Sequence, residues 1–151
     1  MIELKLSRIE DIPLIVTMEN DVETAPYIMP YEHDKHQYEM TNSGIVYLSI
    51  FEGALLVGFI ILSLEPHDSI EFRRIVIAVK GRGIGQLAMH KMEAYCQSVL
   101  KAQRIWLDVF ESNLRGLYLY KKLGYHQFKQ KNIDGKVLLF FEKIILPIGK
   151  G

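Results

Sequence analysis

The pattern of apolar and polar residues predicts a strand at the start of the chain and a helix directly after it. Residues 2–6 alternate strictly between the two types, which is typical of a half-buried strand. Residues 10–20 carry apolar side chains at helical spacing, and Pro13 comes early enough to lie in a first turn. Residues 22–43 have no clean period, and their prolines, tyrosines and acids suggest a short helix and a loop.

Three β-rich runs fill the middle of the chain. Ile45–Phe51 and Ala54–Leu64 flank a Glu52-Gly53 turn, so we expect a hairpin. Glu71–Val79 is rich in Ile and Val and predicts a further strand, which a glycine-containing loop ends.

After that loop the apolar period changes. Apolar residues recur every three or four positions from Ile84 to Leu100, which predicts a long amphipathic helix. The later elements are a strand at Arg104–Phe110, a helix at Leu114–Leu123 that Ser112 or Asn113 could cap and Gly124 could end, strands at Tyr125–Lys131 and Lys136–Leu146 around an Asn132–Gly135 turn, and a tail at Pro147–Gly151.

The order of these elements is βααββββαβαββ, or the same with one strand fewer. No repeat or linker interrupts it, so residues 1–151 should form a single α/β (α+β) domain with a mixed sheet.

Composition agrees with a globular protein. Hydrophobic residues make up 49% of the chain and charged residues 24%, a balance that excludes intrinsic disorder. The longest apolar run, Ala54–Leu64, is broken by Gly58 and is too short to cross a bilayer, and the charged start of the chain does not read as a signal peptide. The single cysteine, Cys96, excludes a disulfide framework. We therefore expect a cytoplasmic protein with no membrane partner.

The net charge of zero conceals an uneven distribution. Residues 1–70 contain 12 acidic and three basic residues, a balance of −9, whereas residues 71–151 contain six acidic and 15 basic residues, a balance of +9. One half therefore suits a cation and the other an anion, if each faces a ligand. The alternative is that two solvated surfaces neutralise each other. The basic residues are scattered, so nucleic-acid binding has little support.

The loop Lys80-Gly81-Arg82-Gly83-Ile84-Gly85 joins a predicted strand to a predicted helix. A helix start offers unpaired N–H groups and the positive end of the helix dipole, and glycines let a backbone approach a ligand closely. The loop is neither a Walker A loop, because no Gly-Lys-Ser/Thr follows, nor a Rossmann loop, because its glycines are each two residues apart. It is a candidate phosphate site, and a purely structural turn is the alternative.

A second segment follows the long helix and the next strand: Asn113-x-Arg115, then Leu119-Tyr120, then Leu123-Gly124-Tyr125. The glycine loop and this segment, in this order and spacing, resemble the GNAT superfamily of N-acetyltransferases. Members of that superfamily carry an acetyl-CoA loop of the pattern Arg/Gln-x-x-Gly-x-Gly/Ala and a later segment of the pattern Asn…Leu-Tyr…Gly-Phe. The likeness covers most of the chain and is greatest to the ribosomal-protein and small-amine acetyltransferases.

Three features depart from the family pattern. Lys80 stands where Arg or Gln is usual, and the link from Ile77 to the loop is shorter than in many members. Gly116 lies where Ala is common, which should cost roughly 1 kcal/mol inside a helix. Close approach of a ligand or a strand could explain this glycine, and so could simple tolerance.

The resemblance implies a mixed, mostly antiparallel sheet of six to seven strands with about four helices, whose central strands splay apart. It also implies acetyl-CoA as co-substrate; no metal is expected, because the histidines show no metal-binding spacing. The pantetheine would pair with the backbone of Ile77 and Val79 and with the Asn113 amide. An N–H near Ile77, where the family's strand bulges, would stabilise the tetrahedral oxygen. The residues expected to hold the pyrophosphate are Lys80, Arg82, Gly83, Gly85 and Gln86.

The implied reaction is direct attack of an amine on the thioester. A lysine-like amine is protonated at pH 7, and a nearby carboxylate could take its proton, directly or through water. Other members of the family use chains of water molecules and no single base. Glu71 and Asp108 are the candidate bases, and a surface carboxylate is the alternative for each. Tyr120 matches the tyrosine that protonates the departing thiolate, and a core aromatic is the alternative. Cys96 falls on the apolar face of its helix, where it is poorly placed for an acyl-enzyme.

The sequence does not identify the acceptor, because a small-molecule amine and a protein N-terminus both fit. The candidates for an acidic acceptor wall are Tyr27, Tyr31, Glu19, Asp21 and Glu23. A non-catalytic acyl-CoA sensor of the same fold is the first alternative function, and a nucleotide-binding or phosphoryl-transfer protein is the second. A homodimer could form through an exposed strand edge at Leu138–Phe141 and Ile144–Leu146.

Overall fold

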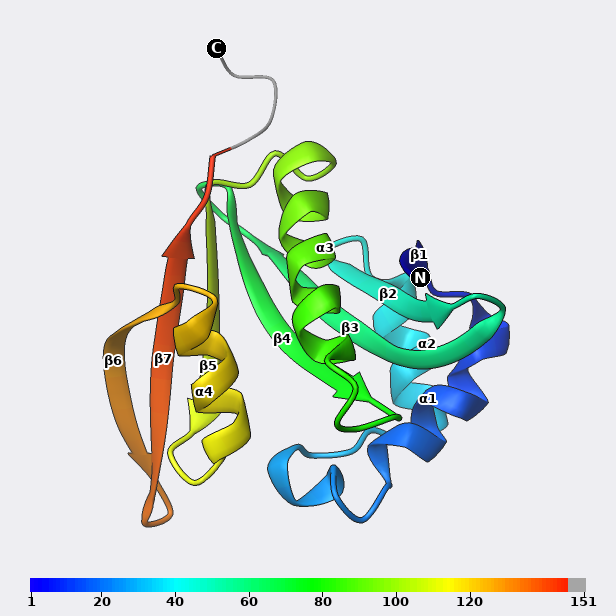
Figure 1. The fold of residues 1–151 in the computed structure, drawn as a ribbon, viewed down its shortest axis with the longest axis horizontal. Helices are drawn as coiled ribbons and strands as arrows, with labels where there is room; N and C mark the ends of the chain where they lie inside the picture. The colour runs from blue at the N-terminus through cyan, green and yellow to red at the C-terminus, as the bar shows by residue number, and fades with distance from the viewer. Residues whose placement is uncertain (147–151) are drawn as a thin grey trace.

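The chain folds around one mixed sheet of seven strands, and the computed structural model describes residues 1–146 (Figure 1). The strands lie in the order β1-β2-β3-β4-β5-β7-β6. Their bounds are β1 Ile2–Leu6, β2 Ile45–Glu52, β3 Leu55–Glu65, β4 Ser69–Ile77, β5 Arg104–Phe110, β6 His126–Ile133 and β7 Lys136–Ile144. This order confirms the predicted fold class and the shorter of the two predicted successions of elements. The predicted tail at Pro147–Gly151 lies outside the described residues.

Helices cover both faces of the sheet. Their bounds are α1 Ile12–Glu19, α2 His33–Thr41, α3 Ile84–Ser98 and α4 Leu114–Lys122, with short 3₁₀ turns η1 Ile9–Asp11 and η2 Ala25–Tyr27. α3 and α4 lie on one face and enclose the larger hydrophobic cluster, whereas α1 and α2 lie on the other face over a smaller one (Figure 1). Among residues 1–146, none of the helices has the length and apolar character that crossing a bilayer requires.

The centre of the sheet contains its one parallel contact. β4 and β5 pair only over Ser69–Glu71 and Arg104–Trp106, at the start of each strand. Beyond this point β4 continues to Ile77 and β5 to Phe110 with no pairing between them, and the two strands diverge (Figure 1). Backbone N–H and C=O groups along both inner edges are therefore open to a ligand. The predicted splay of the central strands is confirmed.

β4 also contains a bulge. The register of β3 against β4 shifts between the pairs Ile61–Arg74 and Leu62–Phe72, which leaves Arg73 as the extra residue. The bulge expected near Ile77 is therefore four residues earlier, and Ile77 itself pairs regularly with Gly58. A bulge reverses which face each later side chain points to, so Arg73 and Arg74 both lie on the face that α1 and α2 cover in part.

The expected dimer edge at Leu138–Phe141 is wrong. β7 lies between β5 and β6, so its backbone is paired on both sides, and Leu138, Leu139 and Phe141 are buried. The edges of the sheet are β1 and β6. The cause is the tight hairpin: Asp134 and Gly135 have φ of 50° and 79°, a two-residue turn that folds β6 back along β7.

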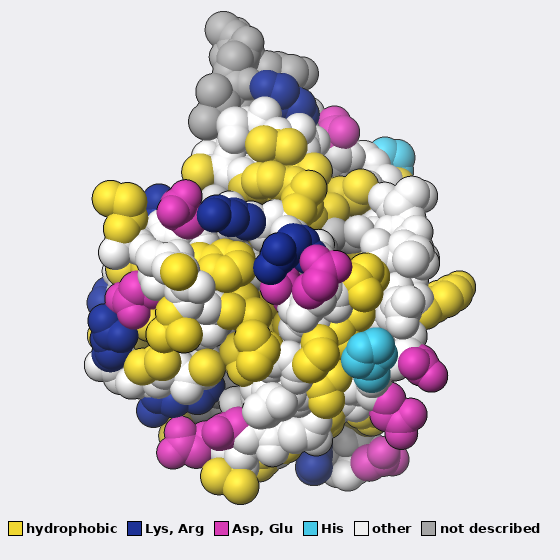
Figure 2. Space-filling view, turned by 90° about the vertical axis from the view of Figure 1, so that its right-hand side faces the viewer, with side chains coloured by type: hydrophobic (Ala, Val, Ile, Leu, Met, Phe, Trp, Pro, Cys, Tyr) yellow, Lys and Arg dark blue, Asp and Glu magenta, His cyan; other side chains and the backbone are white. Residues whose placement is uncertain are grey.

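Two ion pairs among the described residues join the acidic half of the sequence to the basic half. Glu19 pairs with Arg74, and Glu52 pairs with Arg82 through two hydrogen bonds of 2.8 and 2.9 Å. Figure 2 shows acidic and basic side chains next to one another on one face, around hydrophobic groups at its middle. The Glu52–Arg82 pair is partly exposed, whereas the Glu19–Arg74 pair is buried and so does not belong to a solvated surface.

A buried polar network attaches α1 and α2 to the sheet. The Glu19 carboxylate has no solvent exposure and contacts His36 Nε2 at 2.6 Å, the Tyr31 N–H at 3.0 Å and the Arg74 guanidinium. His36 Nδ1 lies 2.6 Å from the Tyr47 hydroxyl. Burial alone would raise the pKa of Glu19, but the hydrogen bonds from His36, Tyr31 and Arg74 lower it overall.

We expect Glu19→Gln to destabilise the fold by about 3–5 kcal/mol, because it leaves the Arg74 charge buried without its partner. The loss should shrink at acid pH. The folded-state pKa of Glu19 lies below the unfolded value, so its stabilisation is complete above about pH 4.5 and is lost as pH falls through the folded value. Urea unfolding at pH 7 and below pH 4 measures both effects.

The control is Glu23→Gln, which removes an exposed carboxylate nearby and should change stability by no more than about 0.5 kcal/mol. Equal losses in the two variants would show that the buried network does not stabilise the fold.

Candidate active site

Side chains from both faces of the sheet meet where β4 and β5 part. Glu71 and Trp106 form the last pair between the strands. Tyr120, from α4, lies on the face of the larger cluster, and Asp108 lies on the opposite face of β5, because its neighbours Leu107 and Val109 point into that cluster. The negative charge of Asp108 is close enough to raise the pKa of Tyr120. The gap therefore has a phenol on one side and a carboxylate on the other.

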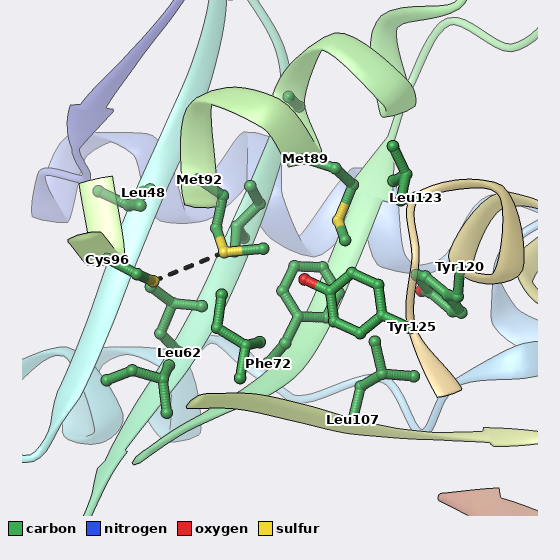
Figure 3. Packing of buried hydrophobic residues seen from close by; sticks show 14 of the residues in the cluster. Leu48, Leu62, Phe72, Met89, Met92, Cys96, Leu107, Tyr120, Leu123 and Tyr125 are labelled. Carbon is green, nitrogen blue, oxygen red and sulfur yellow. Dashed lines mark hydrogen bonds between the residues drawn. The ribbon is translucent and has the colours of Figure 1, made fainter. Parts of the chain in front are cut away.

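Tyr120 is largely enclosed by other aromatic rings. Its ring packs edge-on against Phe72 of β4 at 6.3 Å and near Tyr125 at 6.2 Å between centroids, at the α4 end of the cluster in Figure 3. The Tyr120 phenol forms no hydrogen bond with any residue of the described chain. Within residues 1–146, every fully buried side-chain oxygen or nitrogen has a hydrogen-bond partner. The phenol oxygen is therefore not fully buried and reaches solvent. Burial first, and Asp108 second, raise the pKa of Tyr120 to about 12. The phenol is therefore protonated at neutral pH and can donate a proton.

Asp108 is the free carboxylate of the site. Within residues 1–146 it has no hydrogen bond or ion pair. Its side chain is exposed, but the surrounding protein removes part of its water and raises the pKa of Asp108, and the nearby charge of Glu71 raises it further. Arg73 opposes this shift. A raised pKa makes the carboxylate a better proton acceptor than an ordinary aspartate.

Glu71 is engaged by the strand that carries it. Its Oε1 lies 2.9 Å from a terminal nitrogen of Arg73, the bulge residue, and its side chain is 18% exposed. Residues 71 and 73 are two apart on β4 and share one face, so Arg73 lies beside Glu71 and neutralises this carboxylate. Of the two predicted bases, the structure therefore leaves Asp108 free and pairs Glu71.

The glycine loop has an open concave side. Gly81 and Gly83 have φ of 79° and 73°, which other residues adopt only with strain, and a methyl group added at either would meet nothing within 4 Å. Gly83 is the N-cap of α3, and no side chain fills the cap position. The first N–H groups of α3 thus remain available to an anion. Gln86 and Gly85 lie half-buried in this first turn.

The two cations of the loop are engaged by residues outside it. Lys80 donates a hydrogen bond of 3.2 Å to the Thr24 hydroxyl, and Arg82 is held by Glu52. Burial lowers the pKa of Lys80, the charge of Arg115 lowers it further, and Asp21 and Glu23 oppose this. Both basic side chains would have to turn to reach a pyrophosphate.

Arg115 is a residue that the sequence motif contained but to which we assigned no role. It lies in the first turn of α4 and is near enough to Lys80 for their charges to interact across the gap. Within residues 1–146 it forms no ion pair. Arg115 therefore adds an unpaired cation near the glycine loop, of the kind that a phosphate group could engage.

Asn113 caps α4, as one of the two capping predictions stated. Its Oδ1 accepts a hydrogen bond from the Gly116 N–H at 3.0 Å, so only its Nδ2 group remains for a ligand. The cap also explains Gly116, since a methyl group there would lie 2.9 Å from Asn113 Nδ2. The close approach is thus made by the cap, and not by a strand.

Comparison with known proteins agrees with this geometry. The sequence model of the acetyltransferase (GNAT) family matches residues 12–125, which include the glycine loop and the Asn113–Tyr125 segment. The chain belongs to the GNAT acetyltransferase family. The expectation of an N-acetyltransferase is thereby confirmed at the level of the family. A search of curated protein sequences found no match.

Solved GNAT structures share the whole fold at low sequence identity. A spermidine N-acetyltransferase from Vibrio cholerae, in complex with CoA and spermine, superposes with a TM-score of 0.82 at 19% identity, covering 95% of each chain. The ribosomal-protein-S18-alanine N-acetyltransferase from Escherichia coli gives a TM-score of 0.80 at 15% identity, covering 99% of this chain and 97% of that one. A dodecameric form of the Vibrio cholerae enzyme gives 0.78 at 18% identity, covering 95% and 93%.

The expected acidic acceptor wall is wrong for Glu19, which is fully buried in the network described above. Tyr31 instead presents its ring to two cations, with Lys35 Nζ at 4.2 Å and Arg74 Cζ at 4.4 Å from the ring centre. Asp21 and Glu23 are exposed and lie near Lys80. The side chain of Tyr27 lies outside the described part of the structure.

We expect Gly116→Ala to bring no gain in stability, although alanine is the better helix former by about 1 kcal/mol. The added methyl group displaces Asn113 and so removes a cap that is worth about 1 kcal/mol. In an Asn113→Gly background, which has no side chain to displace, the same change should stabilise the protein by up to about 1 kcal/mol. Thermal unfolding of the four proteins of this cycle measures the coupling, and equal effects of Gly116→Ala in both backgrounds would contradict the assignment.

Proposed function

We propose that this GNAT protein transfers an acetyl group from acetyl-CoA to a primary amine by direct attack within a ternary complex. The observation that carries the proposal is the gap between β4 and β5, with the protonated phenol of Tyr120 on one face and the unpaired carboxylate of Asp108 on the other. A proton donor and a proton acceptor on opposite sides of one opening are what acyl transfer to an amine requires.

The chain's residues fit acetyl-CoA as co-substrate. The open N–H groups at the start of α3, with Gly81 and Gly83, suit the pyrophosphate, and Lys80 and Arg115 supply positive charge on either side of it. The unpaired inner edge of β4, up to Ile77 and on to Val79, offers backbone groups to the pantetheine amides. Asn113, the N-cap of α4 just after β5 ends, could offer its Nδ2 group to the same chain. The bound co-substrate supplies the activated acetyl group.

The proposed chemistry uses three groups of the protein. Asp108 accepts a proton from the ammonium of the acceptor, which frees the nitrogen lone pair to attack the thioester carbon. A backbone N–H on the open edge of β4 donates a hydrogen bond to the carbonyl oxygen as it gains negative charge. As the C–S bond breaks, Tyr120 gives its proton to the leaving sulfur. The attacking nitrogen still carries one extra proton, which it releases to solvent as the amide forms. Asp108 then returns its proton to solvent and the Tyr120 phenolate takes one up, so the net products are the acetylated amine, the CoA thiol and one proton. Cys96 takes no part, because it is fully buried against Met92, with its sulfur 3.6 Å from the Met92 sulfur.

Turnover separates an enzyme from an acyl-CoA sensor of the same fold. We expect Tyr120→Phe to lower kcat by about 10²–10⁴-fold with little change in the Kd for CoA, because only the proton donor is lost. CoA release with a panel of amines, and CoA binding by calorimetry, measure the two quantities.

The matched control is Tyr118→Phe. Tyr118 lies on the same helix but is 69% exposed, so the loss of its hydroxyl should leave kcat unchanged. Binding of CoA without turnover by the unmodified chain, with no effect of Tyr120→Phe, would favour the sensor.

A second prediction concerns the base. We expect Asp108→Asn to abolish the acid limb of the pH profile of kcat/KM, whose midpoint lies above the ordinary aspartate value of 3.8 because the pKa of Asp108 is raised. Activity falls with pH in the unmodified enzyme because protonated Asp108 cannot accept a proton. Glu71→Gln removes the paired carboxylate and should keep the limb. If the acid limb of the profile remained in Asp108→Asn and disappeared in Glu71→Gln, Glu71 and not Asp108 would be the base.

A further inference from the structure

The face of β5, β7 and β6 opposite α4 carries aromatic rings that already have cations of the chain above them. Lys129 Nζ lies 4.9 Å from the centre of the Phe140 ring, Lys136 Nζ lies 5.8 Å from that of Phe110, and Arg104 Cζ lies 5.1 Å from that of Phe128. We call this face the acceptor face. The residues that define it are Arg104, Trp106, Asp108, Phe110, Phe128, Lys129, Lys131, Lys136, Phe140 and Glu142.

Register places the acceptor face directly beside the proposed base. Asp108 pairs with Phe140, and Phe140 pairs with Lys129, so these residues form one row across three strands. Neighbouring strands are about 4.8 Å apart, which puts the backbone of Lys129 about 10 Å from that of Asp108. The Lys129 ammonium folds back over the Phe140 ring and so lies between the two.

The free charges of the acceptor face are positive except at Asp108. Glu142 is paired with Arg104 at 2.7 Å, and none of the three lysines, Lys129, Lys131 and Lys136, forms an ion pair with a residue of the described chain. Glu71, which lies beside Trp106 in the register of β4 and β5, is paired with Arg73. Glu111 and Asp134 lie at the rim beside the β6–β7 hairpin, beyond the ends of the paired strands.

None of the helices within residues 1–146 covers the acceptor face. α1 and α2 pack over β2, β3 and β4 (Figure 1), and the two-residue turn at Asp134 and Gly135 is too short to fold over the strands that it joins. At the far end of the face is an open hollow of about 300 Å³, lined in part by Phe110 and Lys136. A small amine would bury little of its surface here, whereas an extended chain could lie along the face.

We propose that the acceptor is the N-terminus of a polypeptide that carries an acidic side chain at its second or third position, and this rests on the proposed function. With the terminal amine at Asp108, an extended chain advances about 3.3 Å per residue, so its second and third side chains come within reach of the Lys129 ammonium. The same lysines disfavour a polyamine, whose second ammonium follows the first after a few methylene groups. That second ammonium would lie near the Lys129 ammonium and be repelled by it, and Lys129 already occupies the face of the Phe140 ring.

The test is a competition between acceptors at low ionic strength. The amines are three peptides that differ only at positions two and three, with Glu, Ala or Lys, together with spermidine. We expect kcat/KM to fall in the order Glu, Ala, Lys, with about a threefold to tenfold span, and the span to shrink at about 0.5 M salt because exposed charges are screened. The double variant Lys129→Glu, Lys136→Glu should reverse the order.

The control variant is Lys91→Glu, at an exposed position of α3. It also replaces a positive charge with a negative one, but away from the acceptor face, so the order of kcat/KM among the peptides should stay the same. Thermal unfolding shows whether each variant is folded. Highest kcat/KM for spermidine, or an order unaffected by the double variant, overturns this inference and leaves the proposed function standing. Turnover with none of the amines, in a protein that binds CoA, overturns the proposed function and this inference with it.

Discussion

The short parallel contact between β4 and β5 is the constraint on which the rest of the molecule depends. Three residues of each strand pair, and then the strands separate although both continue. Every other neighbouring pair in the sheet is antiparallel and joined along most of its length. The opening is therefore a built-in interruption of an otherwise regular sheet, and the two ends of the sheet act as walls of one site.

Buried polar networks hold each wall in place. On the β4 side, the Glu19 carboxylate joins both N-terminal helices to Arg74, next to the bulge. On the other side, Glu93 of α3 accepts hydrogen bonds from the Tyr125 hydroxyl at 2.8 Å and from Lys143 of β7 at 3.0 Å. Lys143 also donates to the Leu123 carbonyl at the end of α4. This second network connects the helix that starts at the glycine loop to the helix that carries Tyr120, so it sets the spacing between them.

Much of the fold could be predicted from the sequence, because its signals are local. The alternation of residues in β1, the helical period of α3, and the turn glycines each reflect the chain's own neighbours. The strand–loop–helix order around Gly83 and the cap at Asn113 were predicted for the same reason.

Long-range partners could not be predicted in this way. Arg82 pairs with Glu52, and the buried carboxylate of Glu19 pairs with His36 of α2. Both pairs depend on how distant segments of the chain pack together. Arg115 stood inside the recognised motif, but only the packing of α4 against the gap brings it near Lys80. The position of the bulge at Arg73 follows from the register of β3, which no local pattern contains, and it places Arg74 on the face where it meets Glu19.

The inert state of Cys96 has a practical consequence. It is the chain's one cysteine, it is fully buried, and its surroundings raise the pKa of its thiol to about 12, so the reactive thiolate is essentially absent in the folded protein. A cysteine introduced at an exposed position on either side of the gap would be the one that a maleimide dye labels. Movement of the two walls could then be followed by fluorescence in a chain that needs no prior removal of native thiols.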